Sequence, residues 1–387
     1  MSLTFNEELD RLTEAGLRRS MTVVESAQGP RVNINGRDTL LLCSNDYLGL
    51  ANHPALKEAA RAAIGKYGVG SGASRLVSGT MEPHVALEGR IARFKDAPSA
   101  LLFNSGYHAN IGAITALAHR HTEIFSDRLN HASIVDACIL SRAKVHRYQN
   151  RDVDGLERLL KRSKARRKLV VTDGVFSMDG TIAPLVDVAG LLDRYNAMLL
   201  LDDAHATGVL GTHGKGTLEH LGVPAHPSII QMGTLGKAAG SFGAFIAGDK
   251  ALIDLLVSTS RPFIYTTALP PAACAASIAA IDIIEGEPQR RRNLLDNAAF
   301  VRDALAHAGF DTLGSESQII PILIGDPVKT MTVTKRLLDR GVFIQGIRPP
   351  TVPDGTSRLR VSLSASHARA DLEFALSMII EAMNEQG

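Results

Sequence analysis

Short, continuously apolar runs alternate with segments of helical periodicity through the middle of the chain. Strands buried on both faces of a sheet have this pattern, because neither face leaves a position for polar side chains. Their alternation with helices predicts an α/β fold with a mainly parallel central sheet and helices on both faces. The four runs are Ala100–Phe103, Lys168–Thr172, Ala197–Asp202 and Ser228–Met232.

The two ends of the chain show shorter patterns. Asn35 and Gly36 join two short apolar stretches and predict a hairpin. The other expected elements are helices at Phe5–Leu17, Pro54–Ala63 and Asn293–His307, helices after Thr80 and after Ala370, and strands at Gln318–Ile324 and Leu359–Leu363. We therefore expect an N-terminal helix and hairpin segment (1–48), a large α/β domain (49–288) and a smaller C-terminal α/β domain (289–387).

Composition and charge narrow the class of protein. The 387 residues carry 42 lysines and arginines against 40 aspartates and glutamates, and a net charge of +2 argues against a dedicated nucleic-acid-binding protein. No apolar run reaches the roughly 18 residues that a membrane span needs, and the first residues do not resemble a signal peptide. Three widely spaced cysteines indicate neither a disulfide framework nor a metal site. A soluble cytoplasmic protein is expected.

Two glycine-containing segments resemble nucleotide-binding motifs but lack the context those motifs need. Gly68, Gly70 and Ala73 fit the dinucleotide fingerprint, yet they follow a predicted helix, so a close-packed turn is expected instead. Lys237 lacks the upstream glycine and the following Ser or Thr of a phosphate-binding loop. The basic run at 161–168 is expected to be a solvated face, with steering of an anionic substrate as the alternative.

Polar side chains follow each of the four apolar runs. The segment that begins at Asn104 follows the first run and opens a helix, whose free N–H groups suit a phosphate. Asp173 follows the second run, Asp202 and His205 follow the third, and Lys237 follows the fourth. Because ligands gather at the carboxyl ends of parallel strands, we expect these side chains at one site.

Each of these side chains has an ordinary structural explanation: Asp202 could cap a turn, His205 could be a buried core histidine, and Lys237 could be a surface lysine. The combination of the three side chains favours a functional site. A lysine among small residues is available as a Schiff-base nucleophile, because burial lowers the pKa of its amine. A neighbouring carboxylate is what a protonated pyridine nitrogen requires. Together with a phosphate-binding helix end, the residues predict pyridoxal 5'-phosphate (PLP) as cofactor.

The same segments resemble the α-oxoamine synthases, which are fold type I PLP-dependent enzymes. The resemblance implies that an amino acid is condensed with an acyl thioester and that carbon dioxide is lost. It covers nearly the whole chain, from Leu17 to His367, and the segments that carry it are Asn130–Ile134, Asp173–Gly180, Asp202–His205 and Gly233–Lys237.

Within this family, the segment Ile347–His367 is most similar to the members of biotin synthesis that condense L-alanine with a pimeloyl thioester on CoA or a carrier protein. Asp173 stands where many alanine-using members have glutamate, and Ala206 stands where glycine is usual. Because of the aspartate at position 173, family members that use glycine and acetyl-CoA are the alternative. A binding or scaffolding protein on a degenerate fold of this kind would require Lys237 or Asp202 to be inert.

The resemblance also implies a role for each catalytic residue. Lys237 would carry PLP as a Schiff base and later move the Cα proton, while Asp202 would pair with the ring nitrogen. His131 would stack on the ring, contact the substrate and assist proton transfer. His205 and Ser177 would hydrogen-bond the 3' oxygen of the ring. The phosphate would be held by Gly106, Tyr107 and Thr234, with Thr266 and Thr267 from a second subunit.

A second set of residues would bind the substrates. Arg360 would hold the amino-acid carboxylate, because a planar guanidinium suits bidentate recognition, and Asn45 would add to that contact. Arg18 and Thr351 would contact the acyl thioester, with Arg348 as a helper. The resemblance implies a homodimer with shared active sites. From charge, hydropathy and cysteine spacing we expect no nucleic acid, membrane or metal among its partners.

Overall fold

The computed structural model describes residues 4–385. These residues form two compact units: the first contains 4–47, 178–180 and 293–385, and the second contains 48–177 and 181–292. The boundaries near residues 48 and 288 that the sequence predicts stay a proposal.

The second unit is built on a mainly parallel sheet. In the described part of the chain this sheet has seven strands in the order β3-β9-β8-β7-β6-β4-β5, and β9 alone runs antiparallel to its neighbours. The predicted fold class is confirmed by this arrangement. The strands are β3 (Ser99–Phe103), β4 (Thr122–Asp127), β5 (Lys144–Tyr148), β6 (Arg167–Asp173), β7 (Ala197–Asp202), β8 (Ile229–Thr234) and β9 (Ala244–Gly248).

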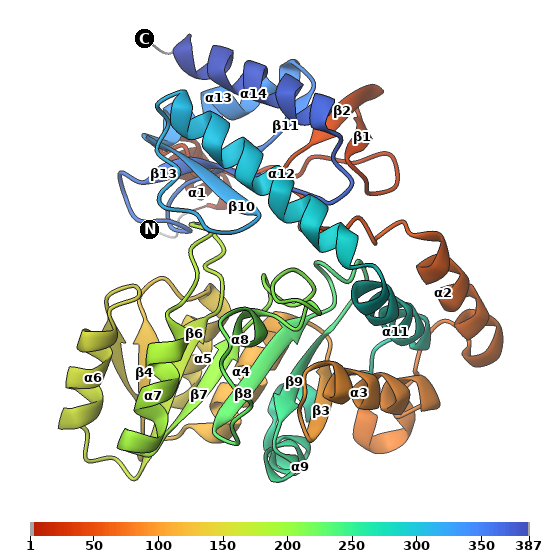
Figure 1. The fold of residues 1–387 in the computed structure, drawn as a ribbon, viewed down its shortest axis with the longest axis vertical. Helices are drawn as coiled ribbons and strands as arrows, with labels where there is room; N and C mark the ends of the chain where they lie inside the picture. Colours follow the sequence, from red (N-terminus) through yellow and green to blue (C-terminus); the bar gives the residue numbers. More distant parts are fainter. Residues whose placement is uncertain (1–3, 386–387) are drawn as a thin grey trace. The chain divides into compact units, whose positions relative to one another are not determined.

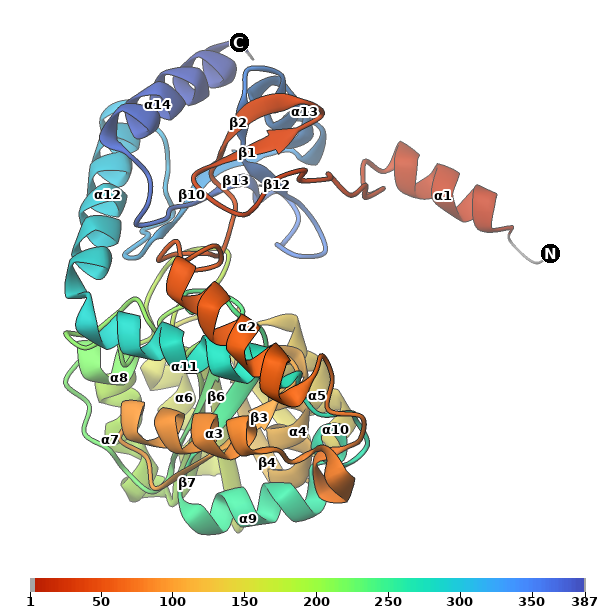
Figure 2. The ribbon, with the colours of Figure 1, turned by 90° about the vertical axis from the view of Figure 1, so that its right-hand side faces the viewer.

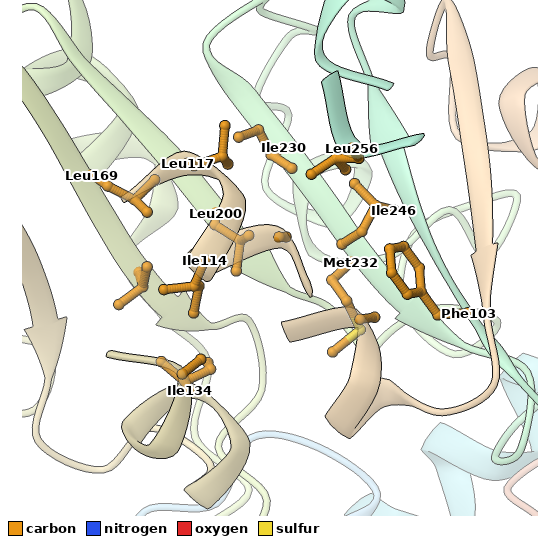
Figure 3. Close-up of a cluster of buried hydrophobic side chains, with 14 of the residues drawn as sticks. Phe103, Ile114, Leu117, Ile134, Leu169, Leu200, Ile230, Met232, Ile246 and Leu256 are labelled. Carbon is orange, nitrogen blue, oxygen red and sulfur yellow. The ribbon is translucent and has the colours of Figure 1, made fainter. Parts of the chain in front are cut away.

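Helices cover both faces of this sheet (Figure 1). Side chains alternate along each strand, so Leu169 and Leu200 join a core with one group of helices, while Val170 and Leu199 join a core with another. Figure 3 shows the first of these cores, where Ile114 and other apolar side chains fill the space beside the strands. The first group of helices is α4 (Gly106–Leu117), α5 (Ala132–Ser141) and α9 (Lys250–Thr259), and the second group is α6 (Val153–Arg162) and α7 (Leu185–Tyr195).

Further helices complete the second unit. The expected helix at Pro54 is α2 (Pro54–Tyr67). Proline suits its first position, where an N–H would have no partner within the helix, and His53 caps the helix by accepting a hydrogen bond from the Ala55 N–H. Figure 2 shows α2 and α3 (Glu82–Phe94) beside α11 (Pro271–Gly286). The remaining helices are a π-helix at Arg75–Gly79, α8 (Thr217–His220) and α10 (Arg261–Ile264).

The turn after α2 differs in one respect from the expectation. Gly68 and Gly72 have φ angles of 78° and 69°, which favour glycine, so a turn is present. A Cβ atom placed on Gly68, Gly70 or Gly72 would meet nothing within 4 Å. The prediction of a close-packed turn is therefore wrong: these glycines serve the backbone conformation, not a close approach.

The first unit contains two small sheets and several helices. One sheet joins the predicted hairpin to β11, and the other is antiparallel in the order β10-β13-β12. Asn35 and Gly36 both have positive φ, as the hairpin turn requires. The strands are β1 (Arg31–Ile34), β2 (Arg37–Leu41), β10 (Ile319–Gly325), β11 (Val342–Phe343), β12 (Gln345–Ile347) and β13 (Ser357–Ser362). The helices are α1 (Phe5–Glu14), α13 (Pro327–Asp339), α14 (Arg369–Asn384) and the part of α12 (Pro288–His307) from residue 293 onward.

Between residues 4 and 385, no helix is both long enough and apolar enough to cross a lipid bilayer.

Candidate active site

A cavity of about 180 Å³ lies at the carboxyl ends of the parallel strands in the second unit. Its position agrees with the general rule for ligand sites in sheets of this kind. The sequence-predicted residues that line it are Gly106, Tyr107, His131, Asp202, His205, Thr234 and Lys237. The structure therefore brings together seven residues that lie on four separate segments of the sequence.

Lys237 and His205 face each other across this cavity. Lys237 lies in the loop after β8, and His205 follows the end of β7. The Lys237 Nζ atom lies 2.8 Å from His205 Nε2, and the imidazole is buried. A neutral imidazole at this distance accepts a hydrogen bond from the ammonium group and orients it.

Asp202 is held by donors on two sides. It is the last residue of β7 and is buried. Its Oδ2 accepts a 2.7 Å hydrogen bond from the Asn110 side-chain amide, and its Oδ1 accepts one of 3.1 Å from the Ala204 N–H. The same amide nitrogen of Asn110 donates to Ser133 Oγ at 2.8 Å. The carboxylate is therefore fixed in one orientation at the cavity wall.

Asn110 was not predicted from the sequence. It lies on α4, four residues after Gly106, so one turn of helix separates the helix end from the side chain that orients Asp202. The signal was present in the segment that opens this helix, but the target of the side chain could not be known from spacing alone.

Asp173 also lines the cavity and was not assigned a role. It pairs with Asp202 in the register of β6 and β7, and 3% of it is exposed. Its Oδ2 accepts a hydrogen bond from the His131 N–H at 3.2 Å, whereas its Oδ1 has no partner among the described residues. Burial, with a further contribution from the charge of Asp202, raises the pKa of Asp173 well above its usual range.

His131 caps the N-terminus of α5. Its Nδ1 accepts a hydrogen bond from the Ser133 N–H at 3.2 Å and lies 2.7 Å from Ser133 Oγ. Desolvation by the surrounding protein lowers the pKa of the imidazole, and the charge of Lys237 adds to this effect, while Asp202 opposes it. A lowered pKa favours the neutral ring at this position.

The helix end that was expected to bind phosphate is the N-terminus of α4. Ser105 caps this helix and accepts a hydrogen bond from the His108 N–H at 3.2 Å. The N–H groups at such a terminus have no partner within the helix. Gly106 and Tyr107 line the cavity at this end, as does Thr234, whose hydroxyl donates to the Gly243 carbonyl at 3.1 Å.

Three predicted residues are not among those that line the cavity. Ser177 is buried in the loop after β6. Thr266 and Thr267 lie after α10, where the Asn104 amide donates to the Thr266 hydroxyl at 3.2 Å and to the Thr267 carbonyl at 2.9 Å. Their expected role involves a second subunit and stays a prediction.

In the first unit, the structure brings together the two residues predicted to hold an amino-acid carboxylate. Arg360 is a buried residue of β13. Its guanidinium donates to the Asn45 side-chain oxygen at 3.3 Å and to Ser362 Oγ at 2.9 Å. The Tyr47 hydroxyl donates to the same Asn45 oxygen at 3.0 Å.

The residues predicted to contact the acyl thioester line a cavity of about 330 Å³ in the first unit. Arg348 is buried there and donates to the Arg18 carbonyl at 2.7 Å, while Arg19 donates to the Thr351 hydroxyl at 3.4 Å. Burial, together with the charge of Arg19, lowers the pKa of Arg348. Lys335 adds another cation to the lining, so the cavity suits an anionic group.

Comparison with known proteins identifies the family. The family model of class I and II aminotransferases matches residues 37–379. A curated 8-amino-7-oxononanoate synthase of Geotalea daltonii is 55% identical over 380 residues, which cover 97% of this chain and 96% of the relative. That of Geobacter sulfurreducens is 54% identical over 391 residues, with complete coverage of both chains. The chain belongs to this family of synthases, within the class I and II aminotransferases.

Solved structures agree with the family assignment. A serine palmitoyltransferase of Sphingomonas wittichii is 32% identical, with a TM-score of 0.93 over 98% of this chain and 96% of that one. A serine palmitoyltransferase described with a PLP internal aldimine is 32% identical, with a TM-score of 0.92 over the same shares. An 8-amino-7-oxononanoate synthase of Francisella tularensis is 28% identical, with a TM-score of 0.78 over 90% of this chain and 98% of that one.

The side chains of the cavity in the second unit fit the cofactor predicted from the sequence. An amine at Lys237 can bond an aldehyde, a carboxylate at Asp202 can pair with a protonated ring nitrogen, and the end of α4 suits a phosphate. The side-chain Oδ1 atoms of Asp173 and Asn110 are buried without a partner in the part of the chain that the structure describes. Neither atom opens onto the cavity, so the fit to the cofactor rests on Lys237, Asp202 and the end of α4.

Proposed function

We propose that this chain catalyses the PLP-dependent, decarboxylative condensation of L-alanine with a pimeloyl thioester. The products would be 8-amino-7-oxononanoate, carbon dioxide and the free thiol carrier, a step of biotin biosynthesis. The observation that carries the proposal is the meeting of Lys237, Asp202 and the end of α4 around one cavity, in a chain that shares more than half of its residues with curated synthases of this name.

When bound, PLP supplies an electron-withdrawing ring that stabilises negative charge at the Cα of the amino acid. Lys237 holds the cofactor, and its amine then takes the Cα proton. His205 orients that amine through the 2.8 Å contact. Asp202, fixed by Asn110, keeps the ring nitrogen protonated, so that the ring continues to attract electrons.

The other predicted residues of the second unit bind the cofactor. We assign the phosphate to the backbone N–H groups of Gly106 and Tyr107 and to the Thr234 hydroxyl. His131 stacks on the ring as a neutral imidazole and assists proton transfer. Ser177 and His205 hold the 3' oxygen.

Arg360 and Asn45 orient the carboxylate of alanine. The orientation of the bound alanine decides which bond at its Cα breaks, because more than one of them can break. Arg18, Arg348 and Thr351 bind the acyl donor, whose charged groups match the cationic lining of their cavity.

We propose further that the chain is a homodimer, in which Thr266 and Thr267 complete the phosphate site of the partner. The cytoplasm is the proposed location, because acyl thioesters of CoA and of carrier proteins are made and used there.

The proposal is tested by thiol release from pimeloyl-CoA by the PLP-loaded protein, with L-alanine and glycine in parallel reactions. Release with alanine and little with glycine, together with 8-amino-7-oxononanoate in the mass spectrum, is the expected result. Release with glycine alone would replace the proposal with a glycine C-acetyltransferase, the reading that Asp173 favours. The Lys237→Ala variant is the control and should release no thiol above background.

A further inference from the structure

A second cavity of the second unit lies at the edge of the large sheet opposite to the candidate active site. Its volume is about 240 Å³, against about 180 Å³ for the candidate active site. It lies where β3 and β8 begin and where β9, which runs antiparallel to both, ends. None of the described residues that we assign to cofactor or substrate lines it. The cavity is therefore separate from the proposed catalytic machinery.

Gln231 places a polar group in the wall of this cavity. It lies within β8 and is 8% exposed, and the buried apolar side chains of Leu218 and Ile229 line the cavity with it. The Gln231 Nε2 donates a hydrogen bond to the Lys95 carbonyl at 3.1 Å. Its Oε1 accepts no hydrogen bond from residues 4–385, yet it keeps accessible surface. This oxygen is an acceptor that a ligand in the cavity can reach.

One carboxylate at the cavity has no compensating cation. Asp249 caps α9 by accepting a hydrogen bond from the Ala251 N–H at 2.8 Å, and it forms no ion pair with any residue that the structure describes. The other carboxylate in the lining, that of Asp96, lies 2.5 Å from the Lys215 Nζ atom. No described lysine or arginine lines the cavity. The charge of Asp249 is thus left uncompensated by the lining.

His226 is the remaining titratable residue in the described lining, and it is uncharged. Its Nδ1 accepts a hydrogen bond from the Ser228 N–H at 3.2 Å, so this nitrogen carries no proton. Its Nε2 lies 3.2 Å from Asp193 Oδ1 and donates to it. An imidazole with one unprotonated nitrogen is neutral. The ring therefore does not offset the charge of Asp249.

We propose that this cavity is a binding site for a small organic cation, which donates N–H hydrogen bonds to Gln231 Oε1 and to the Asp249 carboxylate. The apolar part of the ligand would pack on Leu218 and Ile229. The uncompensated carboxylate favours a cation over an anion. The described residues contain no group of three or more metal-ligating side chains, so the apolar wall selects an organic cation. This inference depends neither on PLP nor on the proposed condensation.

The experiment uses two probes that differ in charge alone. Benzamidine is a planar cation on an apolar ring, and benzamide has nearly the same shape without the charge. Neither is a primary amine, so neither competes with Lys237 for PLP. Dissociation constants are measured by ligand-observed NMR with the PLP-loaded protein. Benzamidine should bind with a dissociation constant of about 1 mM, which is typical of so small a ligand. Benzamide should bind at least about fivefold more weakly.

Three variants assign the binding to this cavity. Asp249→Asn keeps a residue that caps helices well but removes the charge, so benzamidine should bind about fivefold more weakly. Gln231→Met keeps an unbranched side chain but removes the acceptor, which should also weaken binding about fivefold. Asp254→Asn is the matched control, because it removes a carboxylate of the same helix that is 62% exposed and outside the cavity lining. Its affinity for benzamidine should equal that of the wild-type protein.

Three results would overturn the inference: no binding of benzamidine, equal binding of benzamide and benzamidine, or wild-type affinity in Asp249→Asn. If Gln231→Met does not fold, Asp249→Asn still decides. Thiol release by Asp249→Asn should match that of the wild-type protein, which verifies its fold. Selective binding of benzamidine by a wild-type protein that releases no thiol would refute the proposed function and support this inference.

Discussion

The ion pair between Lys95 and Asp203 supports the loop that carries His205. Lys95 caps the C-terminus of α3, and its Nζ lies 3.1 Å from Asp203 Oδ2. The two side chains are 0% and 1% exposed. Asp203 also accepts hydrogen bonds from the Thr217 hydroxyl at 2.6 Å and from the Thr217 N–H at 3.2 Å. Replacing Lys95 with methionine keeps most of the unbranched side chain but leaves a buried carboxylate without its cation.

The expected cost follows from this burial. Removing one partner of a buried ion pair costs about 3–5 kcal/mol, because the other charge stays buried and uncompensated. The entropy of unfolding is about 2.1 cal/mol/K per residue, which for 387 residues is about 0.8 kcal/mol/K. Lys95→Met should therefore lower the Tm by about 4–6 °C, measured by circular dichroism on the PLP-loaded protein.

Two further variants test whether the fall in Tm comes from burial of the ion pair and not from the loss of a lysine charge alone. Lys250→Met removes an ion pair with Asp254 whose side chains are 74% and 62% exposed, so its Tm should change by less than about 1 °C. Lys95→Met combined with Asp203→Asn removes both charges and should be more stable than Lys95→Met alone. A fall in Tm for Lys95→Met no larger than that of the surface control would refute the reasoning.

Three predictions concern the proposed chemistry. Asp202→Asn should lower kcat by about 10²–10³-fold, because the ring nitrogen loses its charged partner; thiol release at the wild-type rate would remove Asp202 from this role. Asn110→Ala should lower kcat by a smaller factor, about 10–100-fold, because one hydrogen bond to the Asp202 carboxylate is lost; steady-state kinetics with unchanged kcat would contradict it. Arg360→Lys should raise the KM for L-alanine about tenfold, because the planar fork that suits a carboxylate is lost. An unaltered KM for alanine would show that its carboxylate binds elsewhere.

The central strands could be predicted because burial on both faces leaves a continuous apolar run. The run at Ala197–Asp202 coincides with β7, and Asp202 and His205 follow it as expected. Three strands of the large sheet were not predicted, and polar residues interrupt two of them, β4 (Thr122–Asp127) and β5. β5 (Lys144–Tyr148) lies at the edge of the sheet and is largely exposed, so polar residues interrupt it. β9 (Ala244–Gly248) is short and rich in small residues, and its antiparallel direction depends on its neighbours.

The candidate site could be predicted in part, for a similar reason. Lys237, Asp202 and the start of α4 all follow strands, and strand order in a parallel sheet brings strand ends together. Contacts that depend on tertiary packing could not be read in this way. Asn110 reaches Asp202 from a helix 92 residues earlier in the chain, and Lys95 reaches Asp203 over 108 residues. No local pattern specifies such partners.

The most direct test of the proposed condensation follows the carboxyl carbon of alanine. The PLP-loaded protein is supplied with pimeloyl-CoA and with L-alanine that carries an isotopic label in its carboxyl group, and released carbon dioxide, free thiol and product mass are measured together. The account predicts labelled carbon dioxide and free thiol in equal amounts, and 8-amino-7-oxononanoate without the label. Thiol release without labelled carbon dioxide, or a product that retains the label, would contradict it.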